Sequence, residues 1–410
     1  MRILIFSTAY LPFIGGAELA VREITNHLAA KVKNGQPKYG FDLITSRLDR
    51  KCRRRERIEN VSVFRVGFGN RFDKFLLPFL GLIKAVRLNR KNSYEIIWAV
   101  MASQGGITAS FFKLIFPKKI MLLNMQEGDS EEHLRRYSLG SDTLFKIFVQ
   151  PFHRLVIKKA DSITAISNDL GKRAKNSGAG CDIKIVPNGV DINKFERKNP
   201  PPLSEELEII YNLKASLGIL KDEKIITTVS RLVKKNGLED LIRGIKLLAD
   251  SEAGENSSFK LLIIGTGELE KILKSMVRES GLENKVIFIG KVPNDEVPKY
   301  LWISDIFIRP SLTEGLGNVF LEAMAAGLPV VATPVGGIVD FLKDGETGVF
   351  CRPGDPQSIK ESLVRILNDE TLKQKLAANG KKLVREKYDW DIIASKMDDI
   401  FSNLVYNNRV

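Results

Sequence analysis

A segment in the last quarter of the chain carries two glutamates in a Glu-x7-Glu pattern, Glu314 and Glu322. Glu314 lies in a glycine-bearing loop after an expected strand, and Glu322 lies one to two turns into the helix that follows. One carboxylate can accept hydrogen bonds from sugar hydroxyls and the other from a ribose diol, while N–H groups at the helix N-terminus face the phosphates between them. The residues predicted to bind the two ends of a nucleotide sugar are Glu314, Gly315, Leu316, Gly317, Asn318, Val319 and Glu322.

An alternative interpretation makes Glu314 a helix-initiating acid and Glu322 a surface residue. The helix around Glu322 is nearly all apolar, however. A buried carboxylate needs a partner. The pattern therefore favours a binding role for both carboxylates.

Two cations, Arg231 and Lys235, follow another expected strand end. A guanidinium fork and an ammonium point charge together suit a diphosphate. The alternative is a solvated surface loop, in which such cations are common. The pair is predicted to neutralise the diphosphate of the same ligand.

Paired glycines occur at two more strand-to-helix turns. Gly15 and Gly16 follow the first expected strand, and Gly265 and Gly267 follow a strand of the second half. Bare backbone at such turns allows close approach of a phosphate, a sugar or a nucleotide edge. A plain tight turn, or close packing, is the alternative at each position.

These residues require parallel sheets to position them. Apolar runs without an alternating polar face predict strands covered by helices on both sides. The runs of the first half are 2–9, 41–45, 61–66, 96–100, 120–123, 162–166 and 183–186, and those of the second half are 225–229, 260–264, 286–289, 306–308, 330–332 and 348–350. The sequence thus predicts an α/β protein with two Rossmann-like domains, 1–190 and 191–388, whose sheets face each other across a cleft. An amphipathic helix closes the chain within 389–410.

The charge is unevenly distributed along the 410 residues. Residues 1–195 hold 33 Lys and Arg against 17 Asp and Glu, a net charge of +16, whereas residues 196–410 hold 30 against 32. This predicts an anionic partner for the first half: a phospholipid surface, a lipid-linked phosphate, an acidic glycan or nucleic acid. A solvated basic face is the alternative. Nucleic acid is disfavoured because no basic helix with interleaved aromatic residues occurs.

Cysteine and histidine usage argues against a metal site. The three cysteines and three histidines share no ligand spacing, and no Asp-x-Asp pair follows a strand. We expect no metal and no cofactor beyond the nucleotide sugar, which is a substrate. The sparse cysteines favour a reducing compartment, and the apolar N-terminus resembles a buried strand rather than a signal peptide. A cytoplasmic protein is expected.

Two segments of the first half combine basic and apolar residues, 47–57 and 71–80. The apolar stretch 75–86 is too short to span a bilayer, which takes roughly 20 residues. Basic residues interleaved with Phe and Leu are typical of an interfacial anchor. We therefore expect peripheral contact with the anionic inner face of a membrane and a lipid-linked acceptor.

Five motifs together resemble the family-4 retaining glycosyltransferases of GT-B fold. They are GGAE, VPNGVDINKF, VSRL, GTGEL and the Glu-x7-Glu segment with its EAMAAGLPVV continuation, and they follow the family's order over nearly the whole chain. The resemblance implies that the C-terminal helix returns to the N-terminal, acceptor-binding domain. It also implies metal-independent binding of the donor by the C-terminal domain.

Site roles follow from the resemblance position by position. Arg231 and a nearby lysine, Lys235 or Lys234, bind the diphosphate; Glu314 holds the transferred sugar and Glu322 the ribose. Gly267 and the backbone around Val292 lie at the nucleotide edge, and Gly15 and Gly16 contact the phosphates.

The chain departs from the family pattern at two positions. Asn236 stands where the family usually has lysine, and Gln126 and Glu127 stand where it commonly has histidine. Glu127 is a candidate acceptor-side base, and either Gln126 or Glu127 occupies the place near the reacting centre.

The predicted function is retaining transfer of a hexose from a UDP- or GDP-linked donor to a glycan or lipid-linked acceptor, in surface polysaccharide or glycolipid synthesis. A nucleotide-sugar 2-epimerase of GT-B fold is the alternative.

Overall fold

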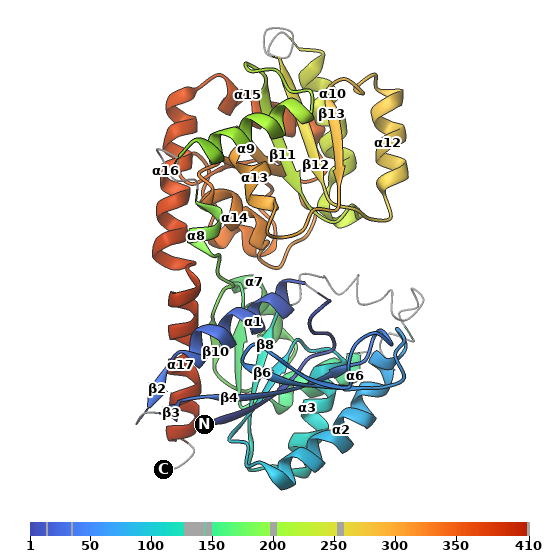
Figure 1. The fold of residues 1–410 in the computed structure, drawn as a ribbon, viewed down its shortest axis with the longest axis vertical. Coiled ribbons are helices and arrows are strands. Elements are labelled where there is room, and N and C mark those ends of the chain that lie inside the picture. The colour runs from blue at the N-terminus through green and yellow to red at the C-terminus, as the bar shows by residue number, and fades with distance from the viewer. Residues whose placement is uncertain are drawn as a thin grey trace. The chain divides into compact units, whose positions relative to one another are not determined.

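A computed structural model describes residues 1–13, 15–33, 36–126, 143, 150–196, 203–251 and 258–407. The chain divides into two compact units (Figure 1). The first comprises residues 1–189 and 390–410, and the second comprises residues 190–389. Among the described residues, no helix is long and apolar enough to cross a membrane.

The first unit is built on an eight-stranded sheet with spatial order β10-β9-β8-β7-β1-β4-β6-β5. All neighbouring pairs are parallel except β5 with β6. The strands are β1 (Arg2–Phe6), β4 (Gly40–Ser46), β5 (Arg55–Ile58), β6 (Val61–Val66), β7 (Ile96–Val100), β8 (Ile120–Met125), β9 (Ser162–Ala165) and β10 (Ile183–Ile185). The short strands β2 (Val32–Lys33) and β3 (Gln36–Pro37) pair separately.

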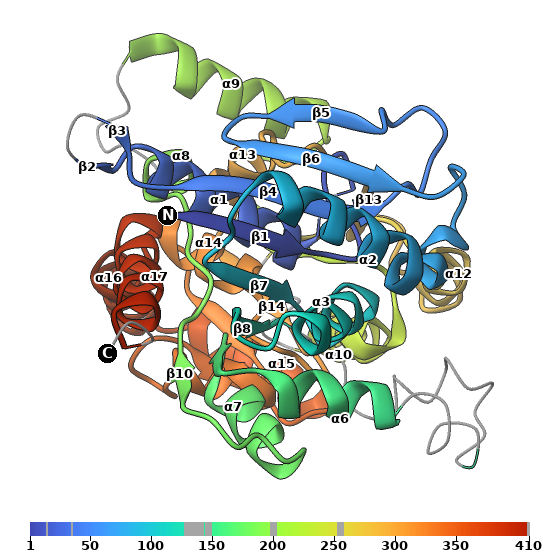
Figure 2. The ribbon, with the colours of Figure 1, turned by 90° about the horizontal axis from the view of Figure 1, so that it is seen from below.

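Helices cover both faces of this sheet because its strands are apolar on both sides. The helices are α1 (Gly16–Ala29), α2 (Asp73–Lys91), α3 (Gln104–Ile115), α6 (Gln150–Lys159), α7 (Asn168–Asn176) and α17 (Trp390–Asn407). Figure 2 shows α2 and α3 side by side along the strands, where they are in contact. The C-terminal helix α17 packs on α1, and its Ile393, Met397 and Phe401 join the core of the first unit. The return of the C-terminal helix to this unit is therefore observed.

The second unit contains a six-stranded, all-parallel sheet with order β13-β12-β11-β14-β15-β16. Its strands are β11 (Lys224–Val229), β12 (Phe259–Ile264), β13 (Val286–Gly290), β14 (Ile306–Arg309), β15 (Val330–Ala332) and β16 (Val349–Phe350). Its helices are α8 (Ile192–Phe195), α9 (Leu203–Ser216), α10 (Leu238–Ala249), α12 (Glu270–Glu279), α13 (Val297–Trp302), α14 (Asn318–Ala325), α15 (Pro356–Leu367) and α16 (Glu370–Lys387), with 3-10 turns η3 (Lys234–Asn236) and η4 (Gly336–Asp340).

Alternate residues of the central strands enter two different cores. Ile226 of β11 and Leu261 of β12 pack with α10, α12 and α15, whereas their neighbours Ile225 and Leu262 pack with α9 and Ile303 on the other face. The continuous apolar runs thus become two buried faces. The predicted α/β class with two parallel, Rossmann-like sheets is confirmed.

Candidate donor-binding site

The predicted donor residues of the second unit gather at one edge of its sheet. Strand β11 lies between β12 and β14, and all three run parallel. From β11 the chain proceeds to β12 on one side and later to β14 on the other, so the strand order reverses there. Ligands of open α/β sheets bind outside the carboxyl ends of the strands at such a reversal.

Close backbone contacts hold the loops of this edge together. A Cβ atom on Gly265, after β12, would lie 1.9 Å from the carbonyl oxygen of Ser230, after β11. A Cβ on Gly237 would lie 1.9 Å from the carbonyl oxygen of Pro310, after β14. Both glycines have positive φ, +130° and +68°. Because any side chain would collide with backbone, glycine is required at both positions, and the three loops form one continuous surface.

Two further contacts locate Gly267 and Val292, the residues predicted to lie beside the nucleotide. A Cβ on Gly267 would lie 2.4 Å from the carbonyl oxygen of Leu232. The N–H of Gly265 donates to the carbonyl oxygen of Gly290 at 2.8 Å, two residues before Val292. Gly267 and Val292 therefore lie on the loops that flank β11 on its β12 side.

Arg231 presents an exposed guanidinium at this edge. The structure records no ion pair for it within the described ranges. Its charge acts on Arg309, where it lowers the pKa in addition to the larger effect of burial. Arg231 therefore lies near the loop that carries Glu314, with its charge directed to solvent.

Asn236, at the position where the resemblance leads us to expect a lysine, has a structural role. Its side chain is buried, and its amide donates to the carbonyl oxygen of Arg231 at 2.7 Å. It closes the turn that carries the cations. The carbonyl oxygen of neighbouring Lys235 accepts the N–H of Leu312 at 2.7 Å, so Lys235 is held beside the Glu314 loop, whereas the Lys234 side chain is exposed.

The two motif glutamates occupy different environments. Glu314 forms an ion pair with Arg309 and accepts the N–H of Gly315 at 3.0 Å. Glu322 lies on α14, half-buried among apolar residues; burial raises its pKa to about 7, while Lys194 and Arg309 act in the opposite direction. Glu314 is not the helix cap, because Gly317 precedes α14 without a side-chain cap. The alternative that treats these glutamates as a helix-initiating acid and a surface residue is therefore disfavoured.

In the first unit, Gly15 and Gly16 begin α1 after β1. Gly15 has extended backbone, and a Cβ there would lie 2.6 Å from the Oε2 atom of Glu18. Burial raises the pKa of the Glu18 carboxyl, whereas hydrogen bonds from the N–H groups of Glu18 and Gly15 lower it. The N-terminus of α1 thus already has a side-chain carboxyl, that of Glu18, close to its N–H groups.

Gln126 belongs to a buried amide network at the end of β8. Its Nε2 donates to Asn124 and to Asn188, both at 2.9 Å, and its Oε1 accepts from Asn188 at 2.9 Å. Both ends of the amide are therefore engaged in joining β8 to the segment before Gly189. Glu127 lies outside the described residues.

Sequence reasoning missed Arg309 and Glu18. Both are charged groups whose partners lie within five residues along the chain. Neither has a spacing signal of its own. The described residues contain no group of three or more His, Cys, Asp or Glu side chains that could hold a metal ion.

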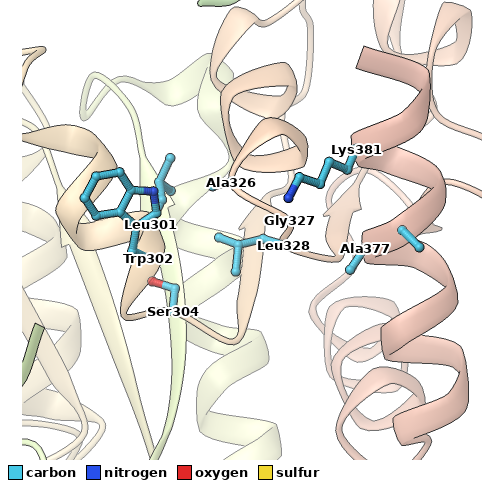
Figure 3. A pocket seen from close by; sticks show the side chains of 9 residues that line it. Leu301, Trp302, Ser304, Ala326, Gly327, Leu328, Ala377 and Lys381 are labelled. Carbon is cyan, nitrogen blue, oxygen red and sulfur yellow. The ribbon is translucent and has the colours of Figure 1, made fainter. Parts of the chain in front are cut away.

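A cavity with a volume of about 300 Å³ lies in the second unit (Figure 3). It is lined by Ser304 and Leu328, which precede β14 and β15, and so lies at the amino edge of the sheet. Polar groups around it are paired: Trp302 donates to a carbonyl oxygen at 2.7 Å, and Lys381 pairs with Glu196 at 2.8 Å. None of the predicted site residues lines it.

Comparison with known proteins identifies the family of the chain. Residues 14–194 match the model of Glycosyltransferase Family 4, and residues 210–383 match that of glycosyl transferases group 1. The chain belongs to the family 4 glycosyltransferases of GT-B type, enzymes that act in glycoconjugate biosynthesis.

Individual relatives extend the comparison. An uncharacterized glycosyltransferase of Methanocaldococcus jannaschii is 35% identical over 219 residues, which is 53% of this chain and 53% of that protein. The match thus spans about half the length of that relative. N-acetyl-alpha-D-glucosaminyl L-malate synthase of Bacillus anthracis is 25% identical over 414 residues, covering 100% of this chain and 99% of that protein. The crystal structure of HepE from Anabaena in complex with UDP and glucose shares the fold, with a TM-score of 0.74 and 21% identity over 98% of this chain and 100% of that chain.

Proposed function

We propose that this chain transfers a hexose, with retention of configuration, from a UDP- or GDP-linked donor to a glycan or lipid-linked acceptor in surface polysaccharide or glycolipid synthesis. The observation that carries the proposal is the exposed guanidinium of Arg231 beside the Glu314 loop, where the strand order reverses. Because Arg231 forms no ion pair with any of the described residues, its charge is suited to an anionic ligand. HepE, of the same fold, binds UDP and glucose.

Each residue of the donor site has a proposed role. Arg231 and Lys235, or Lys234, bind the diphosphate, and the first turn of α14 from Gly317 adds the positive end of a helix dipole. Glu322 accepts hydrogen bonds from the ribose diol and Glu314 from the transferred sugar. Gly267 and Val292 contact the base, and Gly15 and Gly16 bind phosphate oxygens.

Ser230 supplies further support for a ligand at this edge. Its hydroxyl is buried and has no hydrogen-bond partner in the described part of the chain. Buried hydroxyls are nearly always satisfied. A phosphate or sugar oxygen at the end of β11 would satisfy it.

The chemistry is proposed to rest on electrostatic stabilisation. As the anomeric bond lengthens, negative charge grows on the departing diphosphate, and fixed positive groups lower the energy of that state. The acceptor hydroxyl attacks from the same face and loses its proton either to the leaving phosphate or to Glu127, the candidate acceptor-side base. We propose that no divalent ion is needed. Turnover should be undiminished in EDTA; a loss restored by Mn²⁺ would contradict this.

The acceptor side is proposed to rest on a membrane. Exposed apolar side chains, Phe72, Phe75, Phe79 and Ile83, lie along one stripe of α2, whereas Leu77 and Ala85 face the core. Phe79 is 65% exposed. These four exposed side chains form the apolar face of an amphipathic helix, and we call them the α2 surface. Such a face can insert at the headgroup boundary of a bilayer.

Cations lie on and beside α2. The Nζ of Lys74 lies 4.9 Å from the ring centre of Phe75, on the α2 surface itself. At the side of the helix, the Nζ of Lys84 and the guanidinium of Arg55 lie 4.6 and 5.5 Å from the ring centre of Phe64, a buried residue of β6. Burial, followed by repulsion from Arg55, Arg87 and Lys91, lowers the pKa of Lys84. Such a cluster of like charges is relieved by an anion, so we propose anionic lipid as the partner at the inner face of the cytoplasmic membrane.

Thermal-shift titration tests the donor proposal directly. UDP, GDP and their common sugars should be compared, because a ligand present at about 100 times its Kd stabilises a protein by roughly 2.7 kcal/mol. No shift with any of them would contradict a nucleotide-sugar donor. The family match favours transfer over 2-epimerisation; conversion of the donor in the absence of acceptor would reverse that conclusion.

A further inference from the structure

Arg309, the last residue of β14, is a buried arginine. It is 7% exposed, and its guanidinium has three contacts within the second unit. Nη2 pairs with the carboxylate of Glu314, Nε donates to Ser311 at 3.1 Å, and the guanidinium carbon lies 4.5 Å from the ring centre of Phe320. Burying an arginine is costly unless its charge is paired, so this arrangement depends on Glu314.

The contacts fix the orientation of the Glu314 carboxylate. Oε2 accepts from Arg309, and Oε1 accepts the N–H of Gly315 at 3.0 Å. A carboxylate oxygen has two lone pairs, so each oxygen still has one acceptor direction available. The Glu314 side chain, 13% exposed, therefore presents a hydrogen-bond acceptor of fixed orientation and little else to a ligand.

Gly317 leaves the space that the guanidinium uses. Its φ is +82°, and a Cβ there would lie 2.9 Å from Nη2 of Arg309 and 2.6 Å from the ring of Phe320. Gly317 also precedes the first turn of α14. The guanidinium is thus interlocked with the start of the proposed phosphate-binding helix as well as with Glu314.

We infer that Arg309 is a positioning residue for donor recognition, one that holds the Glu314 carboxylate in the orientation in which it accepts hydrogen bonds from the transferred sugar. This inference rests on the proposed function, because it takes Glu314 to contact that sugar. Arg309 is too deeply buried to bind the donor itself. A lysine would supply a point charge without the planar fork and would orient the carboxylate less well.

The test separates recognition of the sugar from recognition of the nucleotide. Dissociation constants of UDP and UDP-glucose, and of GDP and GDP-mannose, are measured by calorimetry at pH 8.5, where Glu322 with its pKa of about 7 is ionised. The variants are Arg309→Met and Arg309→Lys. Arg365→Met serves as the matched control, since Arg365 forms an exposed pair with Asp344 away from the donor loops.

The wild type is expected to bind either the UDP pair or the GDP pair of ligands. For that pair, Arg309→Met should raise the dissociation constant of the nucleotide sugar by about tenfold or more, as expected when one charge-assisted hydrogen bond is lost. The dissociation constant of the bare nucleotide should rise by less than about threefold. Arg309→Lys should give a dissociation constant for the nucleotide sugar between those of the wild type and Arg309→Met, and Arg365→Met should leave both dissociation constants unchanged. Equal weakening of both ligands, or of neither, would overturn the inference. Failure of the wild type to bind any of the four would instead overturn the proposed function.

A double-mutant cycle covers the case in which Arg309→Met does not fold. Arg309→Lys is combined with Glu314→Gln, and the sugar-specific loss is compared in the two backgrounds. The lysine substitution should have no further effect once Glu314 is neutral. An undiminished effect in the Glu314→Gln background would show that Arg309 acts by another route, and the inference would be wrong.

Discussion

The carboxylate of Glu18 lies over the backbone of Gly15, at the N-terminus of α1. Proposed phosphate-binding N–H groups are therefore in contact with the side-chain carboxyl of a residue in the first turn of the same helix. A phosphate that approaches Gly15 and Gly16 must displace this carboxylate or share the N–H groups with it. The Glu18 side chain and the donor are expected to compete.

Neutralising Glu18 should strengthen nucleotide binding. In Glu18→Gln the amide oxygen still accepts from the helix N-terminus, but the repulsion between carboxylate and phosphate is removed. We expect the Kd of UDP, or of GDP, to fall several-fold in calorimetry. Glu23→Gln, on the same helix, is the control and should leave the Kd unchanged. Equal or weaker binding by Glu18→Gln would mean that no phosphate contacts this helix end.

Nucleotide affinity should depend on pH through Glu322. Its pKa of about 7 means that the carboxyl is neutral below that pH and ionised above it. Only the ionised form offers full acceptor capacity to a ribose diol. The affinity for UDP or GDP should rise as pH increases through 7 and level off by about pH 8. Phosphate ionises near pH 6 as well, so the wild type is compared with Glu322→Gln, in which the step near pH 7 should be absent.

The contribution of Glu322 to the free energy of unfolding should decrease as pH rises, whereas nucleotide affinity increases. Burial raises the Glu322 pKa above its unfolded value of 4.5, so the folded chain holds this proton more tightly. The resulting stabilisation is fully present below about pH 4.5 and is lost as pH rises to about 7. Urea unfolding of the wild type and Glu322→Gln across this window should show a difference in free energy that changes with pH. A constant difference would contradict the raised pKa.

Much of the fold follows from the sequence because buried parallel strands are unmistakably apolar. Strands β6, β7 and β15 have the predicted bounds, and the other predicted runs differ by a few residues at their ends. The antiparallel strand β5 was missed. Its residues Arg55–Ile58 begin with three charged side chains in a row at the edge of the sheet, so the sequence indicates only a basic surface there.

The sequence predicts which loops carry the candidate site, but it does not predict which side chains of those loops contact each other. Strand ends and glycines place Arg231 and Glu314 at one edge, since carboxyl ends of parallel strands meet there. The Arg309–Glu314 ion pair depends on how the Glu314 loop folds back on β14, which no spacing rule reveals. The same holds for Asn236, whose hydrogen bond to the carbonyl oxygen of Arg231 gives it a structural role that its position in the sequence does not reveal.

Loss of the Arg231 charge should impair catalysis more than folding. Arg231→Ala removes an exposed guanidinium, so the melting temperature should change little. Turnover should fall by on the order of 10² or more, by analogy with the loss of one preorganised donor. Arg243→Ala on α10, which removes a surface partner of Asp240, is the matched control. A fall of less than about threefold would remove Arg231 from the proposed mechanism.

The α2 surface should bind anionic vesicles. The full chain is expected to float with vesicles of phosphatidylglycerol and phosphatidylcholine and not with phosphatidylcholine alone, and added salt should weaken the association. Phe75→Ser combined with Phe79→Ser removes apolar anchors that are 49% and 65% exposed. Because these side chains contribute little to the core, the double variant should keep its melting temperature and lose flotation.

A matched control distinguishes binding through the α2 surface from nonspecific hydrophobic adsorption to vesicles. Ile272 on α12, 48% exposed, belongs to the second unit, and Ile272→Ser should float like the wild type. Lys84→Ser with Arg87→Ser should abolish the preference for anionic lipid, since these cations contribute to the repulsive cluster. If the wild type floats with neither vesicle, or if the Phe75 and Phe79 variant floats undiminished, the acceptor is not reached through α2. A water-soluble glycan would then be the better candidate, because a basic surface alone can attract an acidic sugar without any contact with lipid.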